Sequence, residues 1–131
     1  MTSPSFTIGI CAESGVSATE IGSLVCDTLR EHGISPSDIT CIASLDSKQH
    51  EPAFDEFART LGVPARFFDA ATLNAETPRL QNPSPLVEAL TGVPGVAEAA
   101  ALAAAGPGSA LVVPKTKSAR VTCAIARHAE P

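Results

Sequence analysis

The chain has 131 residues, of which 44% are hydrophobic and 18% are charged, a balance typical of a folded chain rather than a disordered one. This length suits one hydrophobic core, so we expect residues 1–131 to form a single domain. The formal net charge of −5 argues against a general nucleic-acid-binding protein, which would carry a basic stripe. A local cluster of cations on such an acidic protein can still bind an anionic ligand.

The cysteines and histidines show no metal-binding spacing. Cys11, Cys26, Cys41 and Cys123 lie in apolar segments without Cys-x-x-Cys spacing, and we interpret them as small buried residues in a reducing compartment. We expect neither a disulfide framework nor a metal site, and no other cofactor. No apolar run is long enough to span a bilayer, and the N-terminus lacks the cationic start of a signal peptide. We therefore expect a cytoplasmic protein that does not bind membranes.

Apolar, β-branched runs alternate with helical patterns through the first two thirds of the chain. The predicted strands are residues 7–12, 39–45 and 63–68. The helix after the first strand begins with a capping box, in which Ser17 is the N-cap and Glu20 the third helical residue. The helix after the second strand has Pro52 in its first turn and stops at Gly62. Two short helices are expected next, separated by a loop over residues 77–85.

The stretch from residue 92 to residue 126 organises the rest of the chain. Its predicted helix, Val96 to Ala105, contains one polar side chain, Glu98, so it should be mostly buried. A strand over residues 110–113 and a basic loop at 115–120 follow, and a strand over 121–126 closes the chain. The link between these strands is too short for a helical crossover, so the last strand should be antiparallel. We predict a three-layer α/β/α fold with a mixed, mostly parallel sheet of about five strands.

Two candidate binding segments follow the first two strands. In open α/β sheets, ligands bind outside the carboxyl ends of the strands. The first segment is Glu13, Ser14 and Gly15, whose backbone amides could bind an anion; the alternative is a plain tight connection. The second contains Lys48 and Glu51, which could contact a ligand or belong to a solvated loop.

The other candidates belong to the stretch from residue 92 onward. Gly92 and Gly95 lie in the turn before its buried helix. Glu98 could activate a water molecule or pair with a lysine and fix the neighbouring loop, because a buried carboxylate needs a partner. Lys115, Lys117 and Ser118 could bind ligand carboxylates, or the lysines could be solubilising charges on a sheet edge.

A family resemblance is carried by several of these stretches. They are residues 92–102 (GVPGVAEAAAL), 111–118 (LVVPKTKS), 122–126 (TCAIA), 9–16, 43–51 and 61–64. Together they resemble the CobE family of cobalamin biosynthesis, which is equivalent to the C-terminal domain of CbiG, and the resemblance spans nearly the whole chain. One departure is Ala12-Glu13, where the family often carries a basic residue.

The resemblance implies a role in corrin-ring synthesis. Fused CbiG proteins open a lactone on the macrocycle and release a two-carbon aldehyde, so it implies binding or processing of a corrin precursor, with hydrolase-type activity as one form. The alternative is a non-catalytic carrier that passes an unstable intermediate to another cobalamin-pathway enzyme. Corrin precursors carry many carboxylates, which suit the predicted lysines and helix N-termini. Without Trp or Tyr, the ring would lie on Leu, Val, Pro or Phe side chains.

Overall fold

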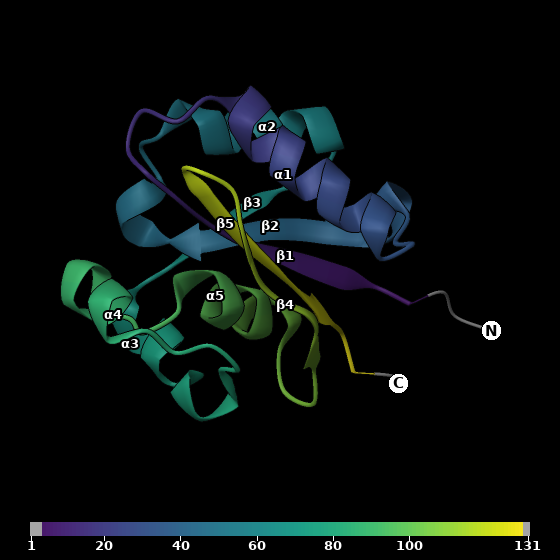
Figure 1. The fold of residues 1–131 in the computed structure, drawn as a ribbon. Helices are drawn as coiled ribbons and strands as arrows, with labels where there is room; N and C mark the ends of the chain where they lie inside the picture. Colours follow the sequence, from purple (N-terminus) through teal and green to yellow (C-terminus); the bar gives the residue numbers. More distant parts are fainter. Residues whose placement is uncertain (1–3, 130–131) are drawn as a thin grey trace.

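The computed structural model describes residues 4–129, and their five strands form one sheet in the order β3-β2-β1-β5-β4 (Figure 1). The strands are β1 (Phe6–Ala12), β2 (Ile39–Leu45), β3 (Ala65–Phe68), β4 (Ala110–Lys117) and β5 (Val121–Arg127). Strand β2 is parallel to β1 and β3, whereas β5 is antiparallel to both β1 and β4. The carboxyl ends of β1 to β4 therefore lie at one end of the sheet. The predicted mixed sheet with an antiparallel last strand is confirmed.

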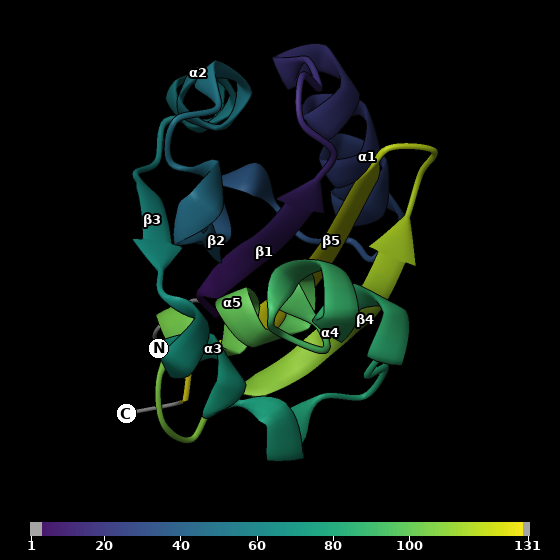
Figure 2. The ribbon, with the colours of Figure 1, turned by 90° about the vertical axis from the view of Figure 1, so that its left-hand side faces the viewer.

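Helices cover both faces of the sheet (Figures 1 and 2). One layer holds α1 (Ala18–Glu31) and α2 (Pro52–Leu61); the other holds α3 (Ala70–Asn74), α4 (Pro85–Thr91) and α5 (Val96–Ala105). Three short 3-10 turns complete the described elements: η1 (Pro36–Asp38), η2 (Asp46–Lys48) and η3 (Thr77–Arg79). The predicted capping box starts α1, and α2 ends at Gly62 with a φ of 81°, a left-handed conformation that favours glycine.

Helix α5 packs unusually close to the centre of the sheet. Along β1 the side chains alternate: Ile8 and Ile10 pack in the core beneath α1 and α2, whereas Thr7 and Gly9 face α5. A Cβ at Gly9 would lie 1.8 Å from the carbonyl oxygen of Ala97, so only glycine permits this approach. The Thr7 hydroxyl donates a 2.7 Å hydrogen bond to the backbone carbonyl of Ala101, one turn further along α5. Gly9 and Thr7 of β1 thus let the backbone of α5 lie directly against the strand.

Strand β4 is longer than its sequence pattern predicts. The expected strand ended at Pro114 with a basic loop behind it, but Lys115 and Lys117 belong to β4, and the turn to β5 contains only residues 118–120. The proline is accommodated because β4 is an edge strand and its register with β5 shifts on both sides of Val113. The lysines are therefore held on a paired strand rather than on a free loop.

Two further expectations need correction. Cys41 and Cys123 are buried as expected, but Cys26 is exposed on α1 and Cys11 is only partly buried. The loop predicted at residues 77–85 contains η3. Among the described residues, no single helix is long and apolar enough to cross a membrane; only the pair α4 and α5, bent by 76°, reaches the required length and composition together.

Candidate functional site

Three pockets that share Cys11 open at the carboxyl end of the sheet. Two of them have volumes of about 310 and 350 Å³ and also share Lys48, Leu90 and Thr91. The third is bordered by Val96 and other residues at the start of α5. We call the three pockets together the Cys11 groove. Its position agrees with the general rule that α/β sheets bind ligands beyond the carboxyl ends of their strands.

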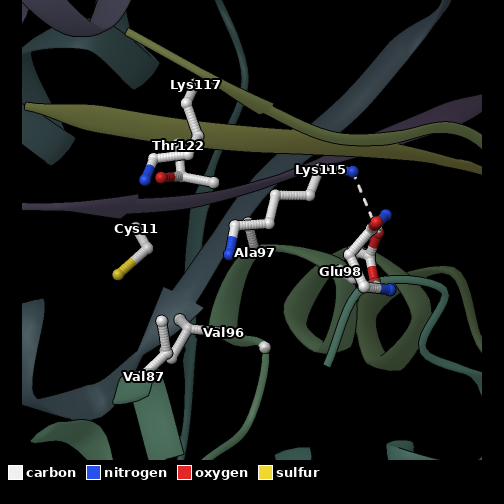
Figure 3. A pocket seen from close by; sticks show the side chains of 10 residues that line it. Cys11, Val87, Val96, Ala97, Glu98, Lys115, Lys117 and Thr122 are labelled. Atoms are coloured by element: carbon white, nitrogen blue, oxygen red, sulfur yellow. Dashed lines mark hydrogen bonds between the residues drawn. The ribbon is translucent and has the colours of Figure 1, made fainter. Parts of the chain in front are cut away.

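Three lysines surround the Cys11 groove. Lys48 follows β2 at the end of η2, and Lys115 and Lys117 lie on β4. The ion pairs within residues 4–129 are Arg30–Asp27, Arg79–Glu76 and Arg120–Glu20, so no described carboxylate pairs with any of these lysines. Figure 3 shows the Lys115 side chain extending across the pocket towards Ala97, at the first turn of α5. Lys48, Lys115 and Lys117 therefore line the groove, and none of them pairs with a carboxylate of residues 4–129.

The residue common to all three pockets is a partly buried cysteine, Cys11. Burial raises the pKa of Cys11, and the nearby charges of Lys48 and Lys115 lower it only in part, so the pKa stays above its ordinary value. A thiol in this state is a weak nucleophile at neutral pH. Cys11 is thus suited to contact a ligand rather than to attack it.

Glu98 lies at the border of the groove but is 1% exposed. Its Oε1 accepts hydrogen bonds from the backbone N–H groups of Gln81 and Asn82, each at 2.9 Å. Its Oε2 accepts from the Asn82 side-chain amide at 2.9 Å. It also accepts from the backbone N–H of Lys115 at 2.9 Å (Figure 3). Burial raises the pKa of Glu98, but these hydrogen bonds outweigh burial and place the pKa below its ordinary value. The carboxylate therefore joins β4 to the segment before α4.

The first loop is held by contacts within the protein. Gly15 has a φ of 81°, and its backbone N–H donates a 2.9 Å hydrogen bond to the Glu51 carboxylate. The backbone N–H of Glu13 donates to the carbonyl of Arg120 at 3.0 Å, and the guanidinium of Arg120 donates to the Ser14 carbonyl at 3.3 Å. The amides of residues 13 and 15 are thus already used, which favours the alternative that this loop is a structural connection.

The two glycines of the turn before α5 have different surroundings. Gly95 is the N-cap of α5 and lines the groove, where a Cβ would lie 3.2 Å from Leu80. Gly92 is the left-handed C-cap of α4, and its carbonyl accepts a hydrogen bond from the Asn74 side chain at 2.8 Å. Gly92 does not line the groove. Its conformation instead sets the angle between α4 and α5.

The structure brings together only part of the predicted site. The predicted residues that line the groove are Glu13, Lys48, Gly95, Glu98, Lys115, Lys117 and Ser118. Those that do not are Ser14, Gly15, Glu51 and Gly92. Sequence reasoning missed Cys11, although its place at the end of the first predicted strand was a signal. It also missed Leu90, an exposed leucine that lines two of the three pockets.

Known proteins resemble this chain along almost all of its length. Residues 6–126 match the family described as cobalamin synthesis G C-terminus. "Protein CobE" of Sinorhizobium sp. is 45% identical over 91% of this chain and 77% of its own length. The cobalt-precorrin-5A hydrolase of Priestia megaterium is 31% identical over 91% of this chain, which corresponds to 31% of the hydrolase. The crystal structure of a CobE protein of the cobalamin pathway superposes with a TM-score of 0.90 and 36% identity, covering 96% of this chain and 95% of the other.

Proposed function

Because the chain belongs to the cobalamin synthesis G C-terminus family and functions in cobalamin biosynthesis, we propose that it binds a corrin-ring intermediate in the Cys11 groove. The observation that carries this proposal is the set of three lysines around one groove that pair with no carboxylate in the described part of the chain. Corrin precursors carry acetate and propionate groups at the rim of the ring, which are the natural partners of ammonium groups. The start of α5, where the helix dipole favours negative charge, adds to this attraction.

Holding the ring is the role that the side chains of the groove support best. Glu98 accepts four hydrogen bonds and has a lowered pKa, so it is a weak base with little capacity left to orient water. We therefore assign Glu98 a positioning role: it fixes the backbone of Lys115. In this form of the proposal the protein is a cytoplasmic carrier that transfers an unstable intermediate to another enzyme of the pathway.

A second candidate function is assistance in opening a lactone on the ring. It is favoured by the similarity to the cobalt-precorrin-5A hydrolase, of whose length this chain covers 31%. The two functions differ in product. A carrier returns the ring unchanged, whereas lactone opening changes the macrocycle and, by analogy with the fused CbiG proteins, releases a two-carbon aldehyde.

Titration with cobyrinic acid, a corrin polycarboxylate, tests binding. Isothermal titration calorimetry at low salt should detect binding by the wild type. The variant Lys115→Met/Lys117→Met should bind about tenfold more weakly or worse, and its affinity should depend less on salt. Incubation with a lactone-bearing precursor, followed by absorbance and aldehyde analysis, separates the carrier from the hydrolase.

Arg59→Met is the control for the loss of a cation outside the groove. Arg59 is an exposed cation on α2 that lines none of the three pockets, so its loss changes the net charge without touching the groove. Affinity for cobyrinic acid should be almost unchanged in this variant. Equal affinities of the wild type and the double lysine variant at low salt would contradict the proposed site.

A further inference from the structure

We propose that helix α4 is the specificity element of the Cys11 groove and that Leu90 packs against one flat face of the ring. This inference rests on the proposed function and adds to it the distinction between a ring and a small carboxylate. The lysines recognise charge, which many metabolites carry. An apolar contact is needed to select a ligand with a broad hydrophobic face.

Helix α4 carries two of the exposed large hydrophobic side chains of the described residues. Three large hydrophobic side chains are exposed within residues 4–129, namely Leu86, Leu90 and Val112, and two of them lie on this helix. Leu86 is 69% exposed and Leu90 is 76% exposed, and α4 contains no buried residue. A seven-residue helix with two solvent-exposed leucines gains little from the core. Such exposed apolar surface often marks a binding surface.

One side of α4 borders the groove. Val87, Leu90 and Thr91 follow helical spacing, so they share a face. Leu86 lies four residues before Leu90 and is therefore its neighbour on the helix surface. Val87 lines the pocket beside Glu98, and Leu90 and Thr91 line both of the other pockets. Leu86 lines none of the three pockets, although it lies on the same helix and is almost as exposed. The chain thus contains two similar leucines, of which one borders the groove.

Hydrogen bonds at both ends hold α4 in this place. At its start, the Ser84 side chain caps the helix, and the Ser84 backbone N–H donates to the Pro94 carbonyl at 2.7 Å. At its end, the backbone N–H of Val93 donates to the Thr91 hydroxyl at 3.1 Å. Glu98 accepts hydrogen bonds from the backbone N–H of Asn82, two residues before Ser84, and from the backbone N–H of Lys115 on β4. The apolar face of α4 and the lysines of β4 are therefore positioned by the same carboxylate.

The combined chemistry identifies the occupant. Cations on β4 and η2 and an apolar face on α4 border one groove, so the matching ligand has carboxylates at its rim and a hydrophobic face. A corrin polycarboxylate has both features. A small tricarboxylate such as citrate has only the first, and it should bind through the lysines alone.

The test compares Leu90→Ser with its control, Leu86→Ser. Both positions are exposed, so both variants should keep the wild-type thermal unfolding temperature. Leu90→Ser should weaken binding of cobyrinic acid about tenfold, because a large apolar contact is lost. It should also weaken the binding of cobyrinic acid methyl ester, in which the carboxylates are blocked, while leaving citrate affinity unchanged. Leu86→Ser should match the wild type with all three probes.

The outcomes separate this inference from the proposed function. If the wild type binds cobyrinic acid and Leu90→Ser binds it equally well, α4 is not the specificity element, although the proposed function stands. Equal losses in both leucine variants would also overturn the assignment, since only one of these two leucines, Leu90, borders the groove. If the wild type binds no corrin at all, the proposed function fails and this inference fails with it.

Discussion

Replacing Glu98 by Gln changes one oxygen of a buried carboxylate to an NH₂ group and removes its charge. Each carboxylate oxygen accepts two hydrogen bonds, and three of the four donors are backbone N–H groups. Whichever way the new amide is oriented, its NH₂ group faces at least one backbone N–H. The Asn82 side chain can rotate to present its oxygen to the new NH₂ group. A backbone N–H cannot, so either Lys115 or residues 81 and 82 would face the NH₂ group without an acceptor.

The expected loss of stability follows from these contacts. A hydrogen bond to a charged group contributes about 1.5–3 kcal/mol, and a buried donor left without an acceptor costs about 1–3 kcal/mol. Glu98→Gln should therefore lower the free energy of unfolding at pH 7 by about 2–4 kcal/mol, measured by urea denaturation. Ring binding should weaken as well, because the backbone of Lys115 loses its partner.

The pH dependence has a definite sign. The hydrogen bonds hold the pKa of Glu98 in the folded protein below the ordinary value of 4.5. Its stabilising contribution is therefore complete above that value and is lost as the pH falls through the folded-state pKa. The difference in unfolding free energy between the wild type and Glu98→Gln should be constant from pH 7 down to about pH 5. It should then shrink on further acidification.

Glu56→Gln is the control, since Glu56 is an exposed carboxylate on α2. This variant should unfold within about 0.5 kcal/mol of the wild type. The reasoning about Glu98 is refuted if Glu98→Gln is as stable as the control at pH 7. It is also refuted if the gap to the wild type widens in acid.

Three further predictions concern packing and the first loop. Gly9→Ala should destabilise the protein by about 3 kcal/mol or more in urea denaturation, because the added methyl group would meet the Ala97 backbone. Glu51→Ala should cost about 1 kcal/mol and speed amide hydrogen exchange in the loop over residues 13–15, because it removes the acceptor of a loop N–H. Iodoacetamide at neutral pH should label exposed Cys26 first, by mass spectrometry, and buried Cys123, whose pKa burial raises to about 11, only on unfolding.

Each of these predictions has its own contrary result. Gly22→Ala is the control for Gly9, since its Cβ would lie 3.4 Å from the Phe57 ring, an ordinary contact; equal stability of the two alanine variants would contradict the packing argument. Unchanged hydrogen exchange in Glu51→Ala would show that the loop does not depend on this carboxylate. Labelling of all four cysteines at one rate would contradict the burial of Cys123.

Local patterns predicted the elements well, and long-range contacts explain what they missed. The capping box at Ser17 involves neighbouring residues, and the buried helix containing Glu98 has an almost entirely apolar composition; the sequence displays both directly. The four donors to Glu98 come from segments about 16 residues to either side, and no periodicity encodes them. The exposure of Cys11 likewise depends on where α4 and β4 end, which is a property of the assembled layers. The predicted strand ended at Pro114, but β4 continues past it because an edge strand tolerates a residue without an N–H.

The position of β4 at the edge of the sheet gives its lysines a second consequence. An outer strand offers unpaired backbone groups to another molecule, and proteins prevent such pairing with prolines and lysines on the edge. Pro114 removes a donor from β4, and Lys115 and Lys117 would bring like charges together if two copies met along this strand. The residues assigned to ligand binding therefore also oppose self-association. Above the protein concentrations used for calorimetry, Lys115→Met/Lys117→Met should form concentration-dependent aggregates in light scattering, whereas Arg59→Met should not.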